Sequence, residues 1–185
     1  DIHIGGLFVQ SVFDKVVEEV NKLKPDAIIV TGDLTDDGLM FQFERARDEL
    51  NRFLCPNKIV IAGNHDYRHT GYLLFKKFFP TKQIYEFDDA LIFTVGTARP
   101  DRDEGEVGYR QNLWMEKTLS KHPETKPKIV AMHHHLIGIP DTGTDKIIIL
   151  DAGDTLRTCL QSGVDLVLCG HRHRPWMWNL GRLAI

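Results

Sequence analysis

Residues 59–66 read Ile-Val-Ile-Ala-Gly-Asn-His-Asp, an apolar run that passes directly into a glycine and three polar residues. Four consecutive apolar residues suit a short strand covered on both faces, as in a parallel sheet. In open α/β sheets, ligands bind at the carboxyl ends of the strands. The same order recurs three more times, so the sequence predicts four polar clusters at one sheet edge. The other three are Ala27–Val30 before Thr31–Asp33, Ile129–Met132 before His133–His135, and Val164–Cys169 before Gly170–His173.

Helical segments separate these predicted strands. Apolar residues recur at helical spacing from Val9 to Leu23, where Pro25 ends the pattern, and again from Phe43 to Leu54. Strands alternating with helices indicate an α/β architecture, and residues 1–185 show no repeat or linker that would divide them into two domains. The other predicted elements are a strand at Ala90–Val95, helices at Tyr72–Phe79, Gln111–Lys121 and Gly153–Leu160, loops at Arg99–Gly108 and Leu136–Asp151, and a hairpin of Trp176–Trp178 with Leu183–Ile185.

The composition is that of a soluble globular domain. The chain has 185 residues, of which 42% are hydrophobic and 26% charged, enough for one hydrophobic core. The formal net charge of -3 provides no basic field for nucleic acid or an anionic membrane. The longest apolar runs are too short to span a bilayer. The odd set of cysteines, Cys55, Cys159 and Cys169, contains no CxxC pair, so we expect reduced thiols and a cytoplasmic location.

The polar clusters contain carboxylates, imidazoles and one carboxamide. Imidazole suits zinc, iron and manganese, and oxygen ligands suit harder ions. The set is too large for one ion and matches two, and Asp33 has two oxygens with which to bridge them. Asp1 and His3 lie two residues apart, on one side of an extended segment, and His171 and His173 repeat that spacing. The sequence therefore predicts a two-metal centre.

Each motif alone has a simpler interpretation. A Gly-Asp pair is most often a turn, an isolated His-x-His is usually a surface pair, and three consecutive histidines can arise by chance. Glycines also precede three candidate ligands, at Gly32, Gly63 and Gly170, where they permit a sharp turn close to bound ions. The combination, with each motif directly after a predicted strand, favours the metal centre.

These motifs resemble the calcineurin-like metallophosphoesterase family over the whole length of the chain. The family pattern is D-x-H, G-D, G-N-H-D/E, a histidine and G-H-x-H. The chain has it as Asp1-Ile-His3, Gly32-Asp33, Gly63-Asn-His-Asp66, His133 and Gly170-His-Arg-His173. The resemblance implies a four-layer α/β/β/α sandwich. The chain opens at Asp1 without a methionine, so we expect the family's first strand and its last strands to lie outside residues 1–185.

The resemblance also implies a role for each residue. The first ion would be bound by Asp1, His3, Asp33 and His173, and the second by Asp33, Asn64, His133 and His171. His65 would contact phosphate or act as an acid without binding metal. Two assignments stay open: Asp66 either orients His65 or caps a turn, and His134 and His135 either face the substrate or lie on the surface. The ions would be divalent or mixed-valence, of manganese, iron or zinc.

Within the family, Gly63–Arg68 and Val130–His134 most resemble the cyclic-nucleotide phosphodiesterase branch, although His135-Leu136 replaces the prolines common there. Asp1–Gly5 also resembles the repair-nuclease branch, but no basic run supports a DNA groove. We expect a small-molecule phosphodiesterase in which a hydroxide bridging the metals attacks phosphorus. The alternatives are a phosphomonoesterase, a DNA repair-type nuclease and a non-catalytic scaffold.

The expected partner is a small phosphate ester, and neither membrane nor nucleic acid is expected as a partner. Three arginines, Arg68, Arg172 and Arg174, are candidates to contact substrate phosphate, and the alternative for each is a solvated surface charge. Oligomeric state, native metals and the choice between monoester and diester are left open by the sequence.

Overall fold

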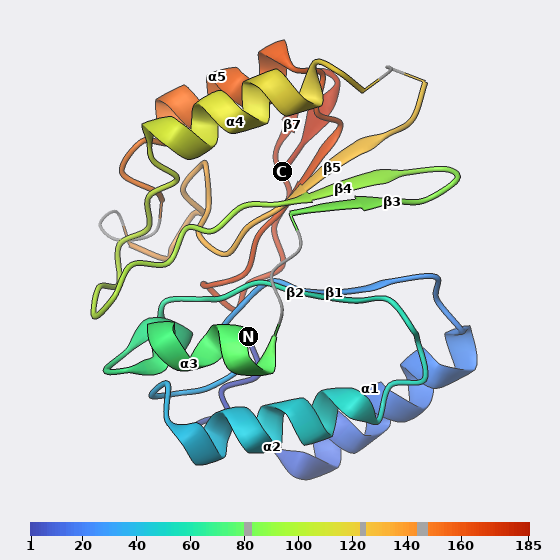
Figure 1. The fold of residues 1–185 in the computed structure, drawn as a ribbon, viewed down its shortest axis with the longest axis vertical. Coiled ribbons are helices and arrows are strands. Elements are labelled where there is room, and N and C mark those ends of the chain that lie inside the picture. Colours follow the sequence, from blue (N-terminus) through green and yellow to red (C-terminus); the bar gives the residue numbers. More distant parts are fainter. Residues whose placement is uncertain (80–82, 123–124, 144–147) are drawn as a thin grey trace.

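The computed structural model describes residues 1–79, 83–122, 125–143 and 148–185. Two sheets face each other, and helices cover the outer face of each (Figure 1). This arrangement confirms the predicted α/β/β/α order of layers. The helices next to the smaller sheet are α1 (Gln10–Leu23), α2 (Met40–Asn51) and α3 (Gly71–Phe78), and those next to the larger sheet are α4 (Tyr109–Leu119) and α5 (Ala152–Gln161).

The smaller sheet pairs β1 (Ile28–Val30) in parallel with β2 (Lys58–Val60). The larger sheet has the order β3-β4-β5-β6-β8-β7. Its central strands β4, β5 and β6 are parallel, so their carboxyl ends share one edge. The strands are β3 (Ile84–Glu86), β4 (Leu91–Thr94), β5 (Lys128–Ala131), β6 (Leu166–Leu168), β7 (Asn179–Leu180) and β8 (Leu183–Ala184).

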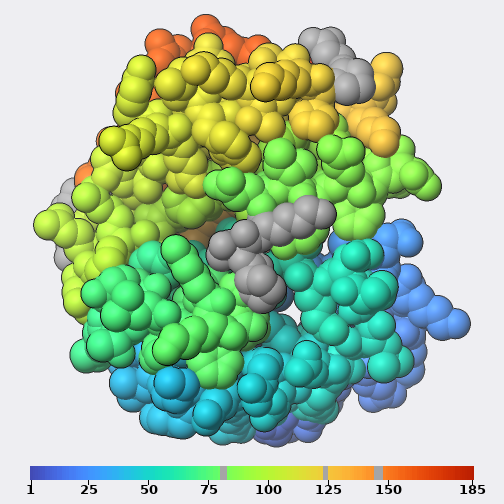
Figure 2. Space-filling view, in the orientation of Figure 1, coloured from blue at the N-terminus to red at the C-terminus, as the bar shows by residue number. Residues whose placement is uncertain are grey.

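Each sheet has its own hydrophobic core. We call residues 1–79 the N-terminal half and the described residues from 83 to 185 the C-terminal half; their colours occupy the lower and upper parts of the surface in Figure 2. The N-terminal core is rich in phenylalanine, including Phe43 and Phe75, which are fully buried. The C-terminal core is mainly aliphatic, with Phe93 and Met115 at its centre. Burial of one such side chain stabilises the fold by about 1.5–3 kcal/mol.

A buried lysine joins the two helices of the C-terminal half. Lys128 begins β5 and is only 2% exposed. Its ammonium group donates to the carbonyl oxygens of Leu119, the last residue of α4, and Ser162, directly after α5. The last carbonyls of a helix have no partner within the helix and carry partial negative charge. Lys128 therefore satisfies both helix ends at once.

The predicted elements are present with small shifts at their ends, and three regions differ. Strand β3 was not predicted, because three residues at a sheet edge leave too short a pattern. The terminal hairpin turns at Gly181, whose φ is +70°, so β7 lies within the segment expected to be the turn. Of the predicted loop 136–151, residues 144–147 lie outside the described part of the chain, and Leu136, Ile139 and Ile149 are buried. No helix among the described residues is long and apolar enough to cross a membrane.

Candidate metal centre

The four predicted clusters meet where the two sheets face each other. They follow β1, β2, β5 and β6, and the start of the chain joins them because Ile4 pairs with Thr35, in the segment after β1. A pocket of about 370 Å³ opens over the clusters. All seven predicted ligands are brought together here, at the edge that the sequence predicts. The residues lining the pocket are His3, Leu7, Asp33, Asp36, Asn64, His65, Arg68, Asp103, His171, Arg172 and His173.

One group of candidate ligands consists of Asp1, His3 and His173, whose ligand atoms all lie within 4.8 Å of one another. The Nε2 atoms of His3 and His173 are 3.0 Å apart. Asp1 Oδ1 lies 3.9 Å from His173 Nε2. His3 Nε2 also lies 3.6 Å from Asp33 Oδ2. This group corresponds to the predicted ligands of the first ion.

A second group surrounds the other side of Asp33. The Nε2 atom of His133 lies 3.3 Å from Asp33 Oδ2 and 3.0 Å from Asn64 Oδ1. His171 Nδ1 is 3.0 Å from the same Asn64 oxygen. A single carboxylate oxygen, Asp33 Oδ2, therefore lies between the imidazoles of the two groups.

The chemistry of these atoms calls for positive charge between them. His133 Nδ1 lies 2.7 Å from the Thr31 carbonyl oxygen, so the N–H of His133 must donate there. In the neutral ring, Nε2 is then a lone pair that faces the oxygens of Asp33 and Asn64. His3 repeats this arrangement, because its Nδ1 lies 3.1 Å from Asp36 Oδ1 while its Nε2 faces His173. At both places lone pairs face one another, so a proton or a cation must lie between them. Histidines whose other ring nitrogen is fixed by a hydrogen bond are typical metal ligands.

The electrostatics agree with this interpretation. Burial raises the pKa of Asp33, but the combined contacts with His133 and His65 lower it further, so the pKa lies below its ordinary value. Burial lowers the pKa of His3 and of His173, so both imidazoles tend to be neutral and able to bind a metal. The donor set thus combines an ionised carboxylate with neutral imidazoles, which fits divalent cations.

The backbone at the site is strained. Four candidate ligands have left-handed backbones, with φ of 51° at His3, 48° at Asp33, 74° at His171 and 50° at His173. Such conformations cost on the order of 1–3 kcal/mol each and cluster at functional sites. Position 32 also requires a glycine for lack of space, because a Cβ there would lie 2.4 Å from His133 Nδ1 and 2.7 Å from the Gly63 nitrogen. The glycine therefore lets the two sheets approach closely.

His65 lies beside the candidate ligands and is fixed by its neighbours. Its Nδ1 donates to the Asp36 carbonyl oxygen at 2.8 Å, and its Nε2 accepts from Arg68 Nη2 at 3.2 Å. Arg68 also donates to the Asp36 carbonyl. Sequence reasoning did not single out Asp36, although its carboxylate contacts His3. Its position three residues after Asp33, in the same polar segment, was the available signal.

Asp66 is a fully buried carboxylate that holds the loops after β1 and β2. It accepts from the backbone N–H groups of Gly63, Leu34 and Thr35 and from the Thr35 hydroxyl. Burial and then the nearby Asp33 raise the pKa of Asp66 to about 6. These contacts favour the turn-capping alternative over orientation of His65, a role that Asp36 fills instead.

The remaining histidines and arginines divide between the site and its surroundings. His134 is fully buried, so it is not a surface residue, and burial lowers its pKa to about 2. His135 is half-buried, and its Nε2 has no partner among the described residues. Arg172 lines the metal pocket and donates to the Thr142 carbonyl. Arg174 lines a different pocket, of about 280 Å³, beside Trp176 and Trp178.

Comparison with known proteins agrees with the family resemblance of the sequence motifs. Residues 1–175 match the family model of the calcineurin-like phosphoesterases. The chain is 28% identical over 168 residues to a probable cyclic nucleotide phosphodiesterase from a Synechococcus species, covering 90% of this chain and 65% of that protein. It is 27% identical to a cAMP/cGMP dual specificity phosphodiesterase from Mycobacterium tuberculosis, covering 86% of this chain and 52% of that protein. The chain thus spans less than two thirds of the length of these relatives.

Solved structures share the fold at low sequence identity. The phosphopantetheinyl hydrolase from Mycobacterium tuberculosis superposes with a TM-score of 0.64 at 13% identity, covering 100% of this chain and 84% of the other. A purple acid phosphatase from yellow lupin seeds also gives a TM-score of 0.64, at 16% identity, covering 86% of this chain and 32% of that one. With the match to the family model over nearly the full chain, these results show that the chain belongs to the calcineurin-like phosphoesterase family.

Proposed function

We propose that the chain is a metal-dependent phosphoesterase that binds two metal ions. Asp1, His3, Asp33 and His173 would hold one ion, and Asp33, Asn64, His133 and His171 the other. The observation that carries this proposal is the position of Asp33 Oδ2, 3.6 Å from His3 Nε2 on one side and 3.3 Å from His133 Nε2 on the other. A carboxylate in this position can bridge two ions about 3.5–4 Å apart, the usual spacing in two-metal sites.

When bound, the ions would supply Lewis-acid polarisation of the phosphoryl group and activation of water. The protein would supply orientation and a proton. His65 has its Nδ1–H fixed by the Asp36 carbonyl, and its Nε2 accepts from Arg68. With Arg68 turned to the phosphoryl group, Nε2 would be the atom that carries a proton to the leaving oxygen. Arg68, held against His65, would contact the phosphoryl oxygens as a charged donor. Asp66 would act only through the loops that it holds.

We propose small phosphodiesters, with cyclic nucleotides first, as the substrate class. The names of the Synechococcus and Mycobacterium relatives support this choice. The pocket of about 370 Å³ suits a small ligand. Duplex DNA would need many cationic contacts, whereas the chain carries a net charge of -3 and the pocket is lined by Asp36 and Asp103 as well as Arg68. All residue types of the family's metal motifs are present, which argues against a non-catalytic scaffold.

The test is hydrolysis by metal-loaded protein of cyclic nucleotides, bis-p-nitrophenyl phosphate, p-nitrophenyl phosphate and duplex DNA at physiological salt. We expect the diesters to be turned over fastest. Faster turnover of the monoester would make the chain a phosphomonoesterase. Salt-sensitive cleavage of DNA without turnover of small esters would favour the nuclease. Loss of all turnover despite two bound ions would contradict the proposal.

A further inference from the structure

A buried histidine ties the loop of residues 97–108 to the end of β5. His134 follows the candidate ligand His133 and is 0% exposed. Its Nε2 lies 3.0 Å from the carbonyl oxygen of Asp103, to which it donates. Its Nδ1 lies 2.8 Å from the Thr97 hydroxyl, which can donate to it. Both ring nitrogens are thus used, and His134 serves as an anchor for the loop.

The loop packs closely against this anchor. A Cβ on Gly105 would lie 2.5 Å from the His134 ring, so a side chain there would displace the loop or the histidine. The backbone N–H of His134 also contacts the Thr97 hydroxyl, at 3.3 Å. Contacts on both sides of Asp103 therefore fix the position of its main chain.

The anchored loop places the Asp103 carboxylate beside two residues of the N-terminal half. Asp103 Oδ1 accepts from Asn64 Nδ2 at 3.4 Å and lies 3.9 Å from Arg68 Nη2. A carboxamide can be turned either way, with its oxygen or its NH₂ group toward the histidines. Because the Asp103 carboxylate only accepts, it favours the orientation in which the Asn64 oxygen faces His133 and His171. In that orientation the oxygen lies 3.0 Å from a ring nitrogen of each histidine.

We infer that Asp103 is a positioning residue for the metal centre: it orients the Asn64 carboxamide so that its oxygen faces the metal, while His134 holds Asp103 in place. The inference rests on the proposed function, because it assigns Asn64 as a ligand. It adds a contribution from a loop outside the family's metal motifs. Outer contacts that orient metal ligands typically change metal affinity by about 10–100-fold when removed.

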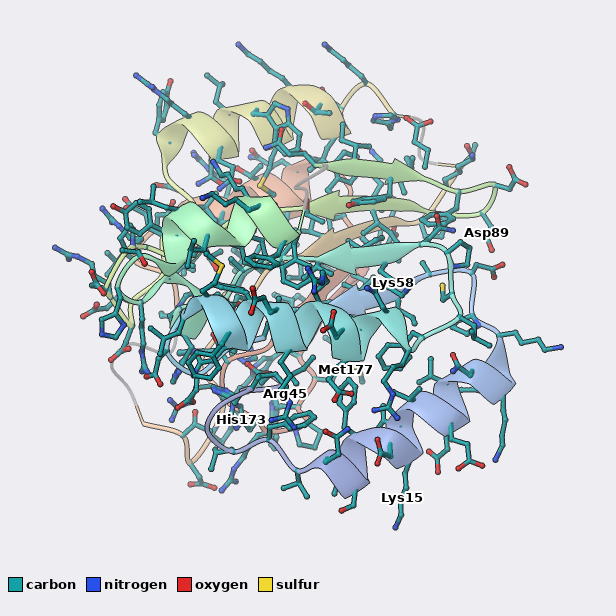
Figure 3. All side chains as sticks on the ribbon, turned by 60° about the horizontal axis from the view of Figure 1, so that its bottom comes forward. Lys15, Arg45, Lys58, Asp89, His173 and Met177 are labelled. Atoms are coloured by element: carbon teal, nitrogen blue, oxygen red, sulfur yellow. The ribbon has the colours of Figure 1, made fainter. Side chains whose placement is uncertain are left out.

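The test measures binding of Mn²⁺, and separately of Zn²⁺, to metal-free wild type, Asp103→Ala, Asp103→Asn and a control variant. We expect Asp103→Ala to weaken the affinity for one of two ions by about 10–100-fold, with little change in the melting temperature of the metal-free protein. Asp103→Asn keeps an oxygen acceptor for Asn64 and should bind within a few fold of wild type. The control is Asp89→Ala, which removes an exposed carboxylate at the β3–β4 turn, on a different side of the molecule from His173 (Figure 3).

The outcomes distinguish failure of the positioning role of Asp103 from failure of the proposed function. Wild-type affinity in Asp103→Ala would overturn the inference while leaving the proposed function intact. If Asp103→Asn is as weak as Asp103→Ala, the carboxylate acts through its charge, and orientation of Asn64 is overturned. If wild type binds neither ion, the proposed function fails and the inference fails with it. Should Asp103→Ala melt far below wild type without metal, Asp103→Leu, which keeps the size of the side chain but has no acceptor, replaces it and should lose the same affinity; wild-type affinity in Asp103→Leu would overturn the inference.

Discussion

The N-terminal and C-terminal halves meet at the candidate metal centre, but they bring different atoms to it. Every carboxylate and carboxamide candidate, Asp1, Asp33 and Asn64, comes from the N-terminal half, together with His3. The C-terminal half brings only the imidazoles of His133, His171 and His173. The supporting structures differ as well, because the N-terminal sheet has two short strands and the C-terminal sheet has six.

The difference shows that neither half contains a complete site. The histidines of the C-terminal half need the Asp33 charge, and Asp33 needs a cation or protons from both sides. Several described contacts across the boundary belong to the site itself, such as His133 with Thr31, His171 with Asp1, and Asn64 with His133. Metal binding should therefore join the halves, and four experiments test that view.

Removal of the shared carboxylate should have the largest effect. In Asp33→Ala both predicted ions lose a ligand, so we expect neither to be retained and kcat/KM to fall by more than about 100-fold, the upper end for changes outside the ligand shell. Elemental analysis and kinetics measure this. Asp33→Asn is the matched variant, because it keeps the size of the side chain without its charge. Two ions retained by Asp33→Ala would exclude Asp33 as the bridge.

Truncation of His65 should separate rate from metal content. The imidazole of His65 contacts Asp36 and Arg68, and only its backbone N–H donates to Asp33, at Oδ1. We expect His65→Ala to keep both ions and to lose about 10²–10⁴-fold in kcat, as for other acid–base groups. The loss should be greatest for substrates with poor leaving groups. Equal turnover by wild type and variant on good and poor leaving groups would contradict the assigned role.

Metal binding should stabilise the whole molecule. An ion that binds only the folded state raises the free energy of unfolding by about 2.7 kcal/mol at 100 times its Kd, roughly 5–10 °C in melting temperature for a chain of this size. Melting curves with metal, with chelator and after metal is restored would measure this. If the two halves are joined by the ions, hydrogen exchange should slow on both sides of the boundary. Slowing in one half alone would mean that the ions do not connect them.

The smallest effect is expected from a change confined to the C-terminal half. Lys128→Met keeps a long side chain but leaves the Leu119 and Ser162 carbonyls without their donor, at a cost of about 1–3 kcal/mol. Chemical denaturation of the metal-free protein measures this loss. Metal affinity should be unchanged, because β5 begins at Lys128 and the ligands follow its other end. A large loss of metal affinity would show that the contacts of Lys128 with the ends of α4 and α5 affect the metal centre.

Local patterns were sufficient to predict the alternation of strands and helices and the position of the site, whereas the four layers were implied by the resemblance to the family. Short apolar runs that end in glycine and polar residues mark the carboxyl ends of β1, β2, β5 and β6. Roles that depend on contacts between distant segments were not predictable. Asp36 contacts His3 from 33 positions away, and Asp103 reaches Asn64 from a loop 39 positions along the chain. The same limit left Asp66 with two roles until its four donors were located.

The left-handed backbones of His3, Asp33, His171 and His173 lower the stability of the metal-free fold, although they belong to residues that are candidate metal ligands. Glycine accepts this conformation at little cost, whereas aspartate and histidine, although they adopt it more readily than most residues, do so at a higher cost than glycine. Substitution of these residues by glycine should therefore leave the metal-free fold as stable as before or more stable, even as the ligands disappear. A screen for stability alone would then select variants that have lost the metal centre. In this protein, thermal resistance of the metal-free chain is a poor guide to the retention of its chemistry.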